Sequence, residues 1–448
     1  MKITYSIEQQ PFESCWLRFE LEDGDDISAR AGSAQYDRLL STPVVTELVS
    51  GGSLGMSDHI HPDLLTVAAL LVCGQTRIKR LNVPNLPSYE MCRVVKERFG
   101  IDVISDDGVE GHSARRRAGS LPGLAFSGGI DSCAALLLLP RQTVSVFMRR
   151  SHLEELPKSM YKEAAALDSL NAVATSGRAA VSLRSNVEVI RQPMGFPVDW
   201  SNSLPLVLNA DALEIESISF GTVLESAGGL GKYKYTNLSD RTIYSRWAPI
   251  FEVAGIDMSL PVSGLSEVLT SKLVREHGQF LKAQSCVRGE PGKPCGRCFK
   301  CFRKSITEAA LSGDKFSSDQ VAAFFRSQEI RRRIVQSPIH HEIGLAWALS
   351  RIPHAGGIME ALGARAKVYC DQFDGLDFLE RPFLPNIEAY VPVSIRASVI
   401  DRVVEWLGEP NSLDISLVQS WDVSAILESP EYIAAVDNTV SRLAKVSE

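Results

Sequence analysis

Apolar and polar positions alternate with different periods along the chain, and these periods change twice. In the first region the apolar side chains repeat every second residue in some stretches and with helical spacing in others. The predicted strands are residues 3–7, 15–21 and 76–81, and the predicted helices are 61–73 and 88–99. A polar stretch rich in Gly and Arg over 105–120 is typical of a linker. We therefore expect an N-terminal α+β module over residues 1–118.

Short apolar runs and helical patterns follow one another in the second region. The predicted strands are residues 124–126, 143–148, 187–191 and 218–221, and the predicted helices between them are 133–139, 153–170 and 204–213. Strands that alternate with helices in this way favour an α/β fold with a doubly wound parallel sheet. We expect this domain over residues 119–310.

The pattern becomes helical after residue 304, with prolines between the segments. The predicted helices are residues 306–311, 318–327, 343–349 and 397–407. We expect a C-terminal helical region over residues 311–448, and its sequence offers no catalytic signature.

Composition limits the class of protein. The 448 residues suit two or three domains, and the net charge of −7 argues against nucleic acid as a direct ligand. The start of the chain lacks the apolar segment of a secretory signal, and the apolar runs are too short to cross a bilayer. A cytoplasmic protein without membrane contact is expected, and its nine cysteines then favour a metal site over disulfides.

A loop with two adjacent glycines connects a predicted strand to a predicted helix. Such a loop turns backbone N–H groups toward phosphate oxygens, and the helix N-terminus adds partial positive charge. Its serines can donate hydrogen bonds, whereas its aspartate can cap the helix or hold Mg²⁺ against phosphates. The alternative is a tight turn without a ligand. The loop reads Ser127, Gly128, Gly129, Ile130, Asp131 and Ser132.

The loop lacks the Gly-Lys of a Walker A sequence and the spacing of a dinucleotide fingerprint. It resembles the Ser-Gly-Gly-x-Asp-Ser loop of the PP-loop ATP pyrophosphatases, which have a HUP-type fold. The resemblance implies that ATP, with Mg²⁺, is cleaved between its α- and β-phosphates, leaving an adenylated substrate. It assigns catalytic roles to Ser127, Asp131 and Ser132, and we expect a basic residue near the leaving pyrophosphate. Arg149 is our candidate for that role, with Arg150 and Lys272 as alternatives.

Four cysteines occur within sixteen residues, at Cys286, Cys295, Cys298 and Cys301. Four thiolates suit a tetrahedral Zn²⁺, and the glycines between them allow sharp turns. Nearby Lys and Arg residues would offset the negative charge of the site. Iron–sulfur ligation is the rival interpretation, although the proline that often follows the last cysteine is missing. We predict structural zinc.

The loop and the cysteine spacing together resemble the QueC family, the 7-cyano-7-deazaguanine synthases. Residues 200–204 resemble the family's Asn-bearing helix, and Phe220, Gly221 and Thr222 resemble its following strand and nucleotide-binding glycine. Residues 260–266 match only loosely, because the family's lysine is missing there. The resemblance covers residues 120–310. The length and layout of the whole chain resemble the QueC-like components (QatC) of the bacterial Qat antiphage systems.

The family resemblance implies a ligase or synthase that forms C–N bonds. It implies that the carboxylate of 7-carboxy-7-deazaguanine is adenylated by ATP and then attacked by an amine. The regions outside the family match suggest a protein amine on a partner encoded in a defence operon. The open alternatives are a tRNA-thiolating enzyme, a PP-loop peptide epimerase, and a non-catalytic nucleotide-binding scaffold in a defence complex.

His340, His341 and His354 are interpreted as surface or core residues, and Trp200 as either core or base-stacking.

Overall fold

The computed structural model describes residues 1–9, 12–27, 42–49, 60–105, 113–115, 119–150, 163–230, 233–353 and 356–445. The first part of the predicted helix 153–170 and the residue His354 lie outside these ranges. None of the helices in the described ranges combines the length and the apolar composition that crossing a bilayer requires.

The described strands form one mixed sheet with the order β10-β9-β6-β7-β8-β3-β2-β1-β4-β5. Strands β6 to β10 run parallel, whereas β8, β3, β2 and β1 pair antiparallel in turn, and β4 and β5 run parallel to β1. The predicted α/β class is confirmed. The strands of the domain expected over residues 119–310, β6 to β10, are parallel as predicted, and the N-terminal strands make the whole sheet mixed. The strands are β1 Lys2–Glu8, β2 Ser14–Glu20, β3 Val44–Glu47, β4 Arg80–Asn82, β5 Asp102–Ile104, β6 Leu121–Ala125, β7 Val144–Arg150, β8 Ala180–Ser185, β9 Ile215–Ser219 and β10 Asp257–Ser259.

Helices cover both faces of the parallel strands. Along β7, Val146 packs into the apolar cluster that contains α1, α5 and α8, whereas Phe147 packs into the cluster that contains α3 and α9. Successive side chains of a strand point to opposite faces, so alternate apolar residues reach both layers. These helices are α1 Pro62–Cys73, α2 Tyr89–Phe99, α3 Ile130–Leu138, α4 Ala164–Thr175, α5 Leu204–Leu208, α6 Leu224–Ala227, α7 Thr242–Ser245, α8 Ala248–Val253 and α9 Glu267–His277.

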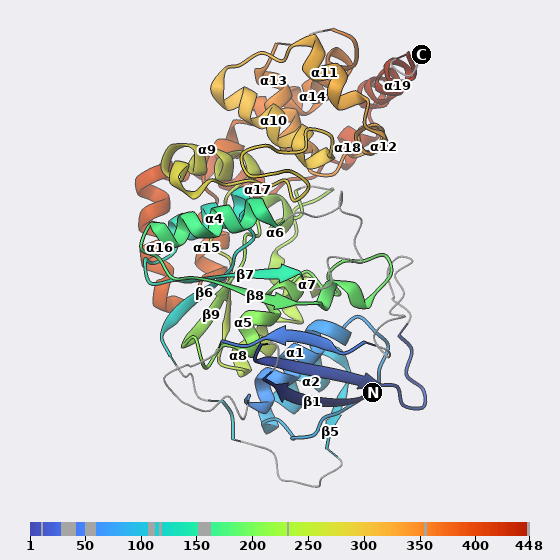
Figure 1. Cartoon of the computed structure of the whole chain (residues 1–448). Helices are drawn as coiled ribbons and strands as arrows, with labels where there is room; N and C mark the ends of the chain where they lie inside the picture. The colour runs from blue at the N-terminus through green and yellow to red at the C-terminus, as the bar shows by residue number, and fades with distance from the viewer. Residues whose placement is uncertain are drawn as a thin grey trace.

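The N-terminal strands extend this sheet across its β8 edge (Figure 1). The hydroxyls of Thr46 and Ser185 lie 3.0 Å apart where β3 meets β8. Leu64 of α1 shares one buried apolar cluster with Val146 and Ile218 of the parallel strands. The parts of the chain before and after the boundary expected at residue 118 therefore contribute strands to one continuous sheet.

The prediction of a strand over residues 187–191 is wrong, because Val187–Ile190 forms a 3₁₀ turn. The strand lies earlier, at β8, where the serines and arginine of Ala180–Ser185 weaken the apolar pattern. The apolar side chains of the turn are buried as the prediction required, but they reach the core from a turn rather than from the pleat of a strand.

The C-terminal helices divide between two locations (Figure 1). Helices α10 to α14 and α19 pack around Phe325, Trp347 and Tyr369 as a helical core of their own. Helix α16 instead returns to the sheet and packs on α3, where Arg402 donates to the carbonyls of Leu138 and Leu139 at 2.7 and 2.6 Å. The helices are α10 Phe299–Ser312, α11 Ser318–Phe325, α12 Gln328–Ile334, α13 Glu342–Arg351, α14 Gly357–Gln372, α15 Leu384–Tyr390, α16 Val393–Leu407, α17 Ser412–Gln419, α18 Ser424–Leu427 and α19 Pro430–Lys445.

Candidate functional site

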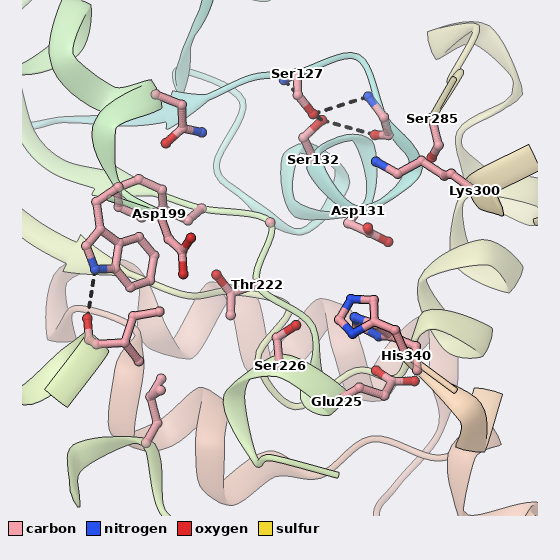
Figure 2. Close-up of a pocket in the computed structure, with 18 of the residues that line it drawn as sticks. Ser127, Asp131, Ser132, Asp199, Thr222, Glu225, Ser226, Ser285, Lys300 and His340 are labelled. Atoms are coloured by element: carbon pink, nitrogen blue, oxygen red, sulfur yellow. Dashed lines mark hydrogen bonds between the residues drawn. The ribbon is translucent and has the colours of Figure 1, made fainter. Parts of the chain in front are cut away.

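The carboxyl ends of β6 and β9 meet at a point where the sheet reverses its winding. Helix α3, which follows β6, covers one face, whereas α8, which follows β9, covers the other. Such a switch point leaves a crevice in which doubly wound proteins bind ligands. A cavity of about 560 Å³ opens here, within the usual range for small-molecule sites. Its walls include the Ser127–Ser132 loop on one side and Gly221, Thr222 and Glu225 on the other (Figure 2).

The Ser127–Ser132 loop is held by its own side chains and by close packing. The hydroxyls of Ser127 and Ser132 lie 3.0 Å apart, and Ser132 also donates to the Gly129 carbonyl at 3.0 Å. Gly128 has a φ of +71°, and a Cβ there would lie 2.9 Å from the Ala166 Cα. Glycine is therefore required at that position for both backbone conformation and space.

Gly221, predicted to bind the nucleotide, lies against the first turn of α3. A Cβ at Gly221 would lie 3.0 Å from the Ser132 backbone nitrogen and the Asp131 carbonyl carbon. The absence of a side chain lets the end of β9 approach the helix N-terminus. The structure thus brings Gly221 to the loop residues Ser127 and Asp131, which precede it by 94 and 90 positions in the sequence.

Asp131 faces residues from two later helices. Its Oδ1 accepts a hydrogen bond from the Thr270 hydroxyl at 3.0 Å and lies 3.5 Å from the Lys304 Nζ. The α3 N-cap has no side-chain hydrogen bond. The capping role considered for Asp131 is thus not observed. Its carboxylate instead lines the cavity beside the loop.

Buried charges surround this carboxylate. Glu267 pairs with Arg303 at 2.9 Å and with the His341 Nδ1 at 3.2 Å. Burial raises the pKa of Glu267, but the charges of Lys304 and Arg303 outweigh it and lower the pKa to about 2. Burial also lowers the pKa of His341 to about 3, so its imidazole is neutral at pH 7.

Glu225 lines the cavity close to this group. Both of its carboxylate oxygens accept from the Glu267 backbone N–H, at 2.9 and 3.0 Å. Burial first, and the charge of Glu267 second, raise the pKa of Glu225 to about 8. Such a carboxyl group can hold a proton at neutral pH beside an ionised neighbour.

Aromatic and polar side chains line the end of the cavity away from the loop. The Trp200 indole donates to the Ile243 carbonyl at 2.7 Å and packs edge-to-face on Phe220, with ring centroids 4.7 Å apart. Trp200 is thus a wall of the cavity with its nitrogen already bonded. Asn202 Oδ1 is a buried oxygen without a hydrogen-bond partner among the described residues, and Asp199 lines the same end. A ligand with N–H donors would satisfy the Asn202 oxygen and meet an acceptor in the Asp199 carboxylate.

The four cysteines come together as a candidate metal centre. Their sulfurs all lie within 4.8 Å of one another, and those of Cys295 and Cys301 are 3.8 Å apart. Four sulfurs bound at about 2.3 Å around a tetrahedral zinc ion lie about 3.8 Å from one another. The thiol set therefore fits a single metal ion such as Zn²⁺, which supplies cross-links between ligands rather than chemistry at a closed Cys₄ site.

The basic residues predicted for the site are placed elsewhere. Arg149 pairs with Glu163 at 2.6 Å and Arg150 with Glu188 at 2.6 Å, and neither lines the cavity, nor does Lys272. The cations near the Ser127–Ser132 loop are Lys300, which lines the cavity, and Lys304. Their spacing of four residues puts both on one face of α10, which is the signal that could have identified them.

Arg241, His340 and His341 also line the cavity. The interpretation of His340 and His341 as ordinary surface or core residues missed this placement. No sequence pattern near these histidines indicates their place in the cavity, because the residues that they approach, such as Glu267, are distant in the sequence.

The similarity of this chain to a known family lies in its C-terminal half. Residues 246–422 match the model of a family of unknown function (DUF6395). The match includes the four cysteines and most of the helical core, but not the Ser127–Ser132 loop. No curated protein and no solved structure matches the chain.

Proposed function

We propose that the protein is a PP-loop ATP pyrophosphatase of the HUP-type fold that adenylates a carboxylate. One observation carries the proposal: the Ser-Gly-Gly loop and Gly221 meet at the switch point of the sheet, on the wall of a cavity of about 560 Å³. The order of the parallel strands, β10-β9-β6-β7-β8, supports it, since doubly wound nucleotide-binding folds use the same order.

The reaction joins a carboxylate oxygen to the α-phosphorus and breaks the bond to the β-phosphate oxygen, so that pyrophosphate leaves. Catalysis of this kind depends on positioning and on neutralising phosphate charge. Ser127 and Ser132 offer hydroxyl donors beside the N-terminus of α3. Asp131 would hold Mg²⁺, which neutralises phosphate charge when bound.

The other end of the cavity supports a deazaguanine carboxylate as the substrate. Trp200 and Phe220 form apolar walls for a flat ring, while Asn202 Oδ1 and the Asp199 carboxylate offer hydrogen-bond acceptors to a ligand. The N–H groups of a guanine-like edge match these acceptors. The adenylated carboxyl group would then pass to an amine, on a protein partner in a Qat-like antiphage system.

The decisive measurement is release of AMP and pyrophosphate from Mg-ATP, with and without 7-carboxy-7-deazaguanine, using zinc-loaded protein. Release that depends on this compound and disappears in Asp131→Asn supports the proposal. Binding of ATP without release, with every candidate carboxylate and amine, would instead indicate a nucleotide-binding scaffold. Release with a peptide carboxylate would favour the epimerase class.

Zinc and magnesium can be separated in the same assay. Treatment with a zinc-selective chelator gives a sample that lacks zinc but keeps magnesium. Treatment with excess EDTA, followed by addition of zinc alone, gives a sample that lacks magnesium. We expect both to lose pyrophosphate release, the second because phosphate charge is no longer neutralised.

A further inference from the structure

We propose that the four-cysteine centre assembles the nucleotide site, by holding Ser285 and Lys300 against the phosphates. This inference rests on the proposed function, because it requires a nucleotide at the Ser127–Ser132 loop. It gives the metal centre a role in ligand affinity rather than in stability alone.

The chain that leads into the first cysteine is bonded to the loop. Gln284 N–H donates to the Gly128 carbonyl at 2.8 Å. Ser285 Oγ accepts from the Ile130 N–H at 3.2 Å, which occupies a donor of the first turn of α3. Cys286 follows at once, so that a metal ligand lies one residue from the side chain that touches the loop.

The last two cysteines define the start of α10. Cys298 is the N-cap, and its Sγ accepts from the Cys301 N–H at 3.4 Å. Lys300 lies between them, and Lys304 follows one turn later with its Nζ 3.5 Å from Asp131. A metal bound to both cysteines therefore sets the direction in which this helix presents its two lysines.

Ser285 and Lys300 also separate the candidate ATP cavity from a second one. This second cavity, of about 620 Å³, lies between the cysteine segment and α11, and both residues line both cavities. Gly292 and Gly296 in the cysteine segment have positive φ values of 67° and 66°. Those sharp turns bring the ligands together, and bonds to one metal ion would fix them at the wall of the nucleotide cavity.

The test measures binding of Mg-ATP, inorganic pyrophosphate and AMP by calorimetry, together with zinc content. We expect Lys300→Ala to weaken Mg-ATP and pyrophosphate binding about tenfold, since it removes a charge-assisted contact to phosphate. AMP binding and zinc content should not change, which a general structural defect would not reproduce. Lys293→Ala is the matched control, because it removes an exposed lysine of the same segment that lines neither cavity.

Ser285→Ala is the second variant, and we expect it to weaken Mg-ATP binding severalfold with zinc retained. Zinc removal by a chelator should weaken it at least as much, and Ser285→Ala decides the matter if the metal-free protein unfolds. Mg-ATP affinities of Ser285→Ala and Lys300→Ala equal to that of Lys293→Ala would overturn this inference alone. Failure of the zinc-loaded wild type to bind Mg-ATP would overturn the proposed function as well.

Discussion

Two buried clusters of charged and polar residues contain the neighbouring residues His341 and Glu342, one in each cluster. They differ in how closely their members are paired. His341 turns toward the cavity, whereas Glu342 turns into the helical core. The cavity-side cluster comprises Glu225, Glu267, Arg303, Lys304 and His341. The helical-core cluster comprises Glu342, Arg365, Tyr369 and Tyr432.

The helical-core cluster is closed on itself. Arg365 and Glu342 form an ion pair, and Glu342 Oε2 accepts from the hydroxyls of Tyr432 and Tyr369 at 2.8 and 3.2 Å. Arg365 also donates to the carbonyls of Ile334 and Gln336. These bonds join α12, α13, α14 and α19, so the cluster stabilises one arrangement of helices.

The cavity-side cluster is more loosely paired. Both clusters contain buried atoms without a hydrogen bond among the described residues, but the two in the helical core, Glu342 Oε1 and Arg365 Nε, form an ion pair with each other. Lys304 Nζ has only longer contacts, 3.5 Å to Asp131 and 4.0 Å to Glu267. Buried polar groups normally have hydrogen-bond partners, so an exception calls for an explanation such as a catalytic role or a bound ion or water. Burial of charge by itself therefore does not mark a site, whereas a buried cation that lacks a close partner and lies 3.5 Å from a carboxylate of the cavity wall does.

The largest expected effect is on stability, in the helical core. Arg365→Met leaves Glu342 buried without its cation, and we expect a loss of about 3–5 kcal/mol in the free energy of unfolding. Denaturant titration measures it. Binding of Mg-ATP to the folded fraction should match the wild type, and a clear loss of affinity would show that the two clusters are coupled.

Replacing a cation of the cavity-side cluster by methionine should have a smaller effect on stability and a larger one on binding. Lys304→Met should lower the free energy of unfolding by about 1–3 kcal/mol. The loss is limited because Glu267 keeps its ion pair with Arg303 and Asp131 keeps its hydrogen bond from Thr270. Given the proposed function, Mg-ATP binding should weaken about tenfold or more. Equal stability losses in the two variants would remove the distinction drawn between the clusters.

Glu225 predicts a pH dependence of stability. Its pKa of about 8 lies above the ordinary 4.5, so between these values the unfolded chain is ionised while the folded protein keeps the proton. Wild-type stability should therefore fall as pH rises from 4.5 to 8 by at least about 1 kcal/mol relative to Glu225→Gln. Unfolding curves of both proteins at pH 5, 6.5 and 8 test the sign.

His341 should give the smallest effect at neutral pH. The residue has a φ of +58°, which asparagine tolerates well, and its pKa of about 3 makes it neutral. His341→Asn should therefore change stability by about 0.5 kcal/mol or less at pH 8. As pH falls from 6.5 toward 3 the wild type should lose stability that the variant keeps, because only the unfolded histidine takes up a proton.

Sequence patterns predicted several elements closely. The helices expected at 61–73 and 88–99 are α1 and α2, with Ser88 capping the second by accepting from the Met91 N–H. The strands expected at 124–126 and 143–148 overlap β6 and β7. These elements carry their own signals, namely caps and apolar runs. Strand β8 was missed because its polar residues hide the alternation.

The candidate site was predictable only where its residues are adjacent in sequence. The Ser127–Ser132 loop and the cysteines are recognised from spacing, and the structure brings the cysteine sulfurs together as expected. The choice of Arg149 had no such support, and its guanidinium pairs with Glu163 instead. His341 reaches the cavity through the packing of the helical core, which no local pattern encodes, whereas the spacing of Lys300 and Lys304 shows only that they share a helix face.

The sequence by itself determined the local chemistry of this protein. Gly128 permits the turn, Ser127 and Ser132 bond across it, and the cysteine spacing allows four thiols to converge. These features depend on backbone sterics and contacts within a few residues. Only the tertiary structure decided that Lys304 faces Asp131 and that His341, not Glu342, faces the cavity. Those outcomes follow from burying both sheet faces and the helical core at once, which couples residues far apart in the chain.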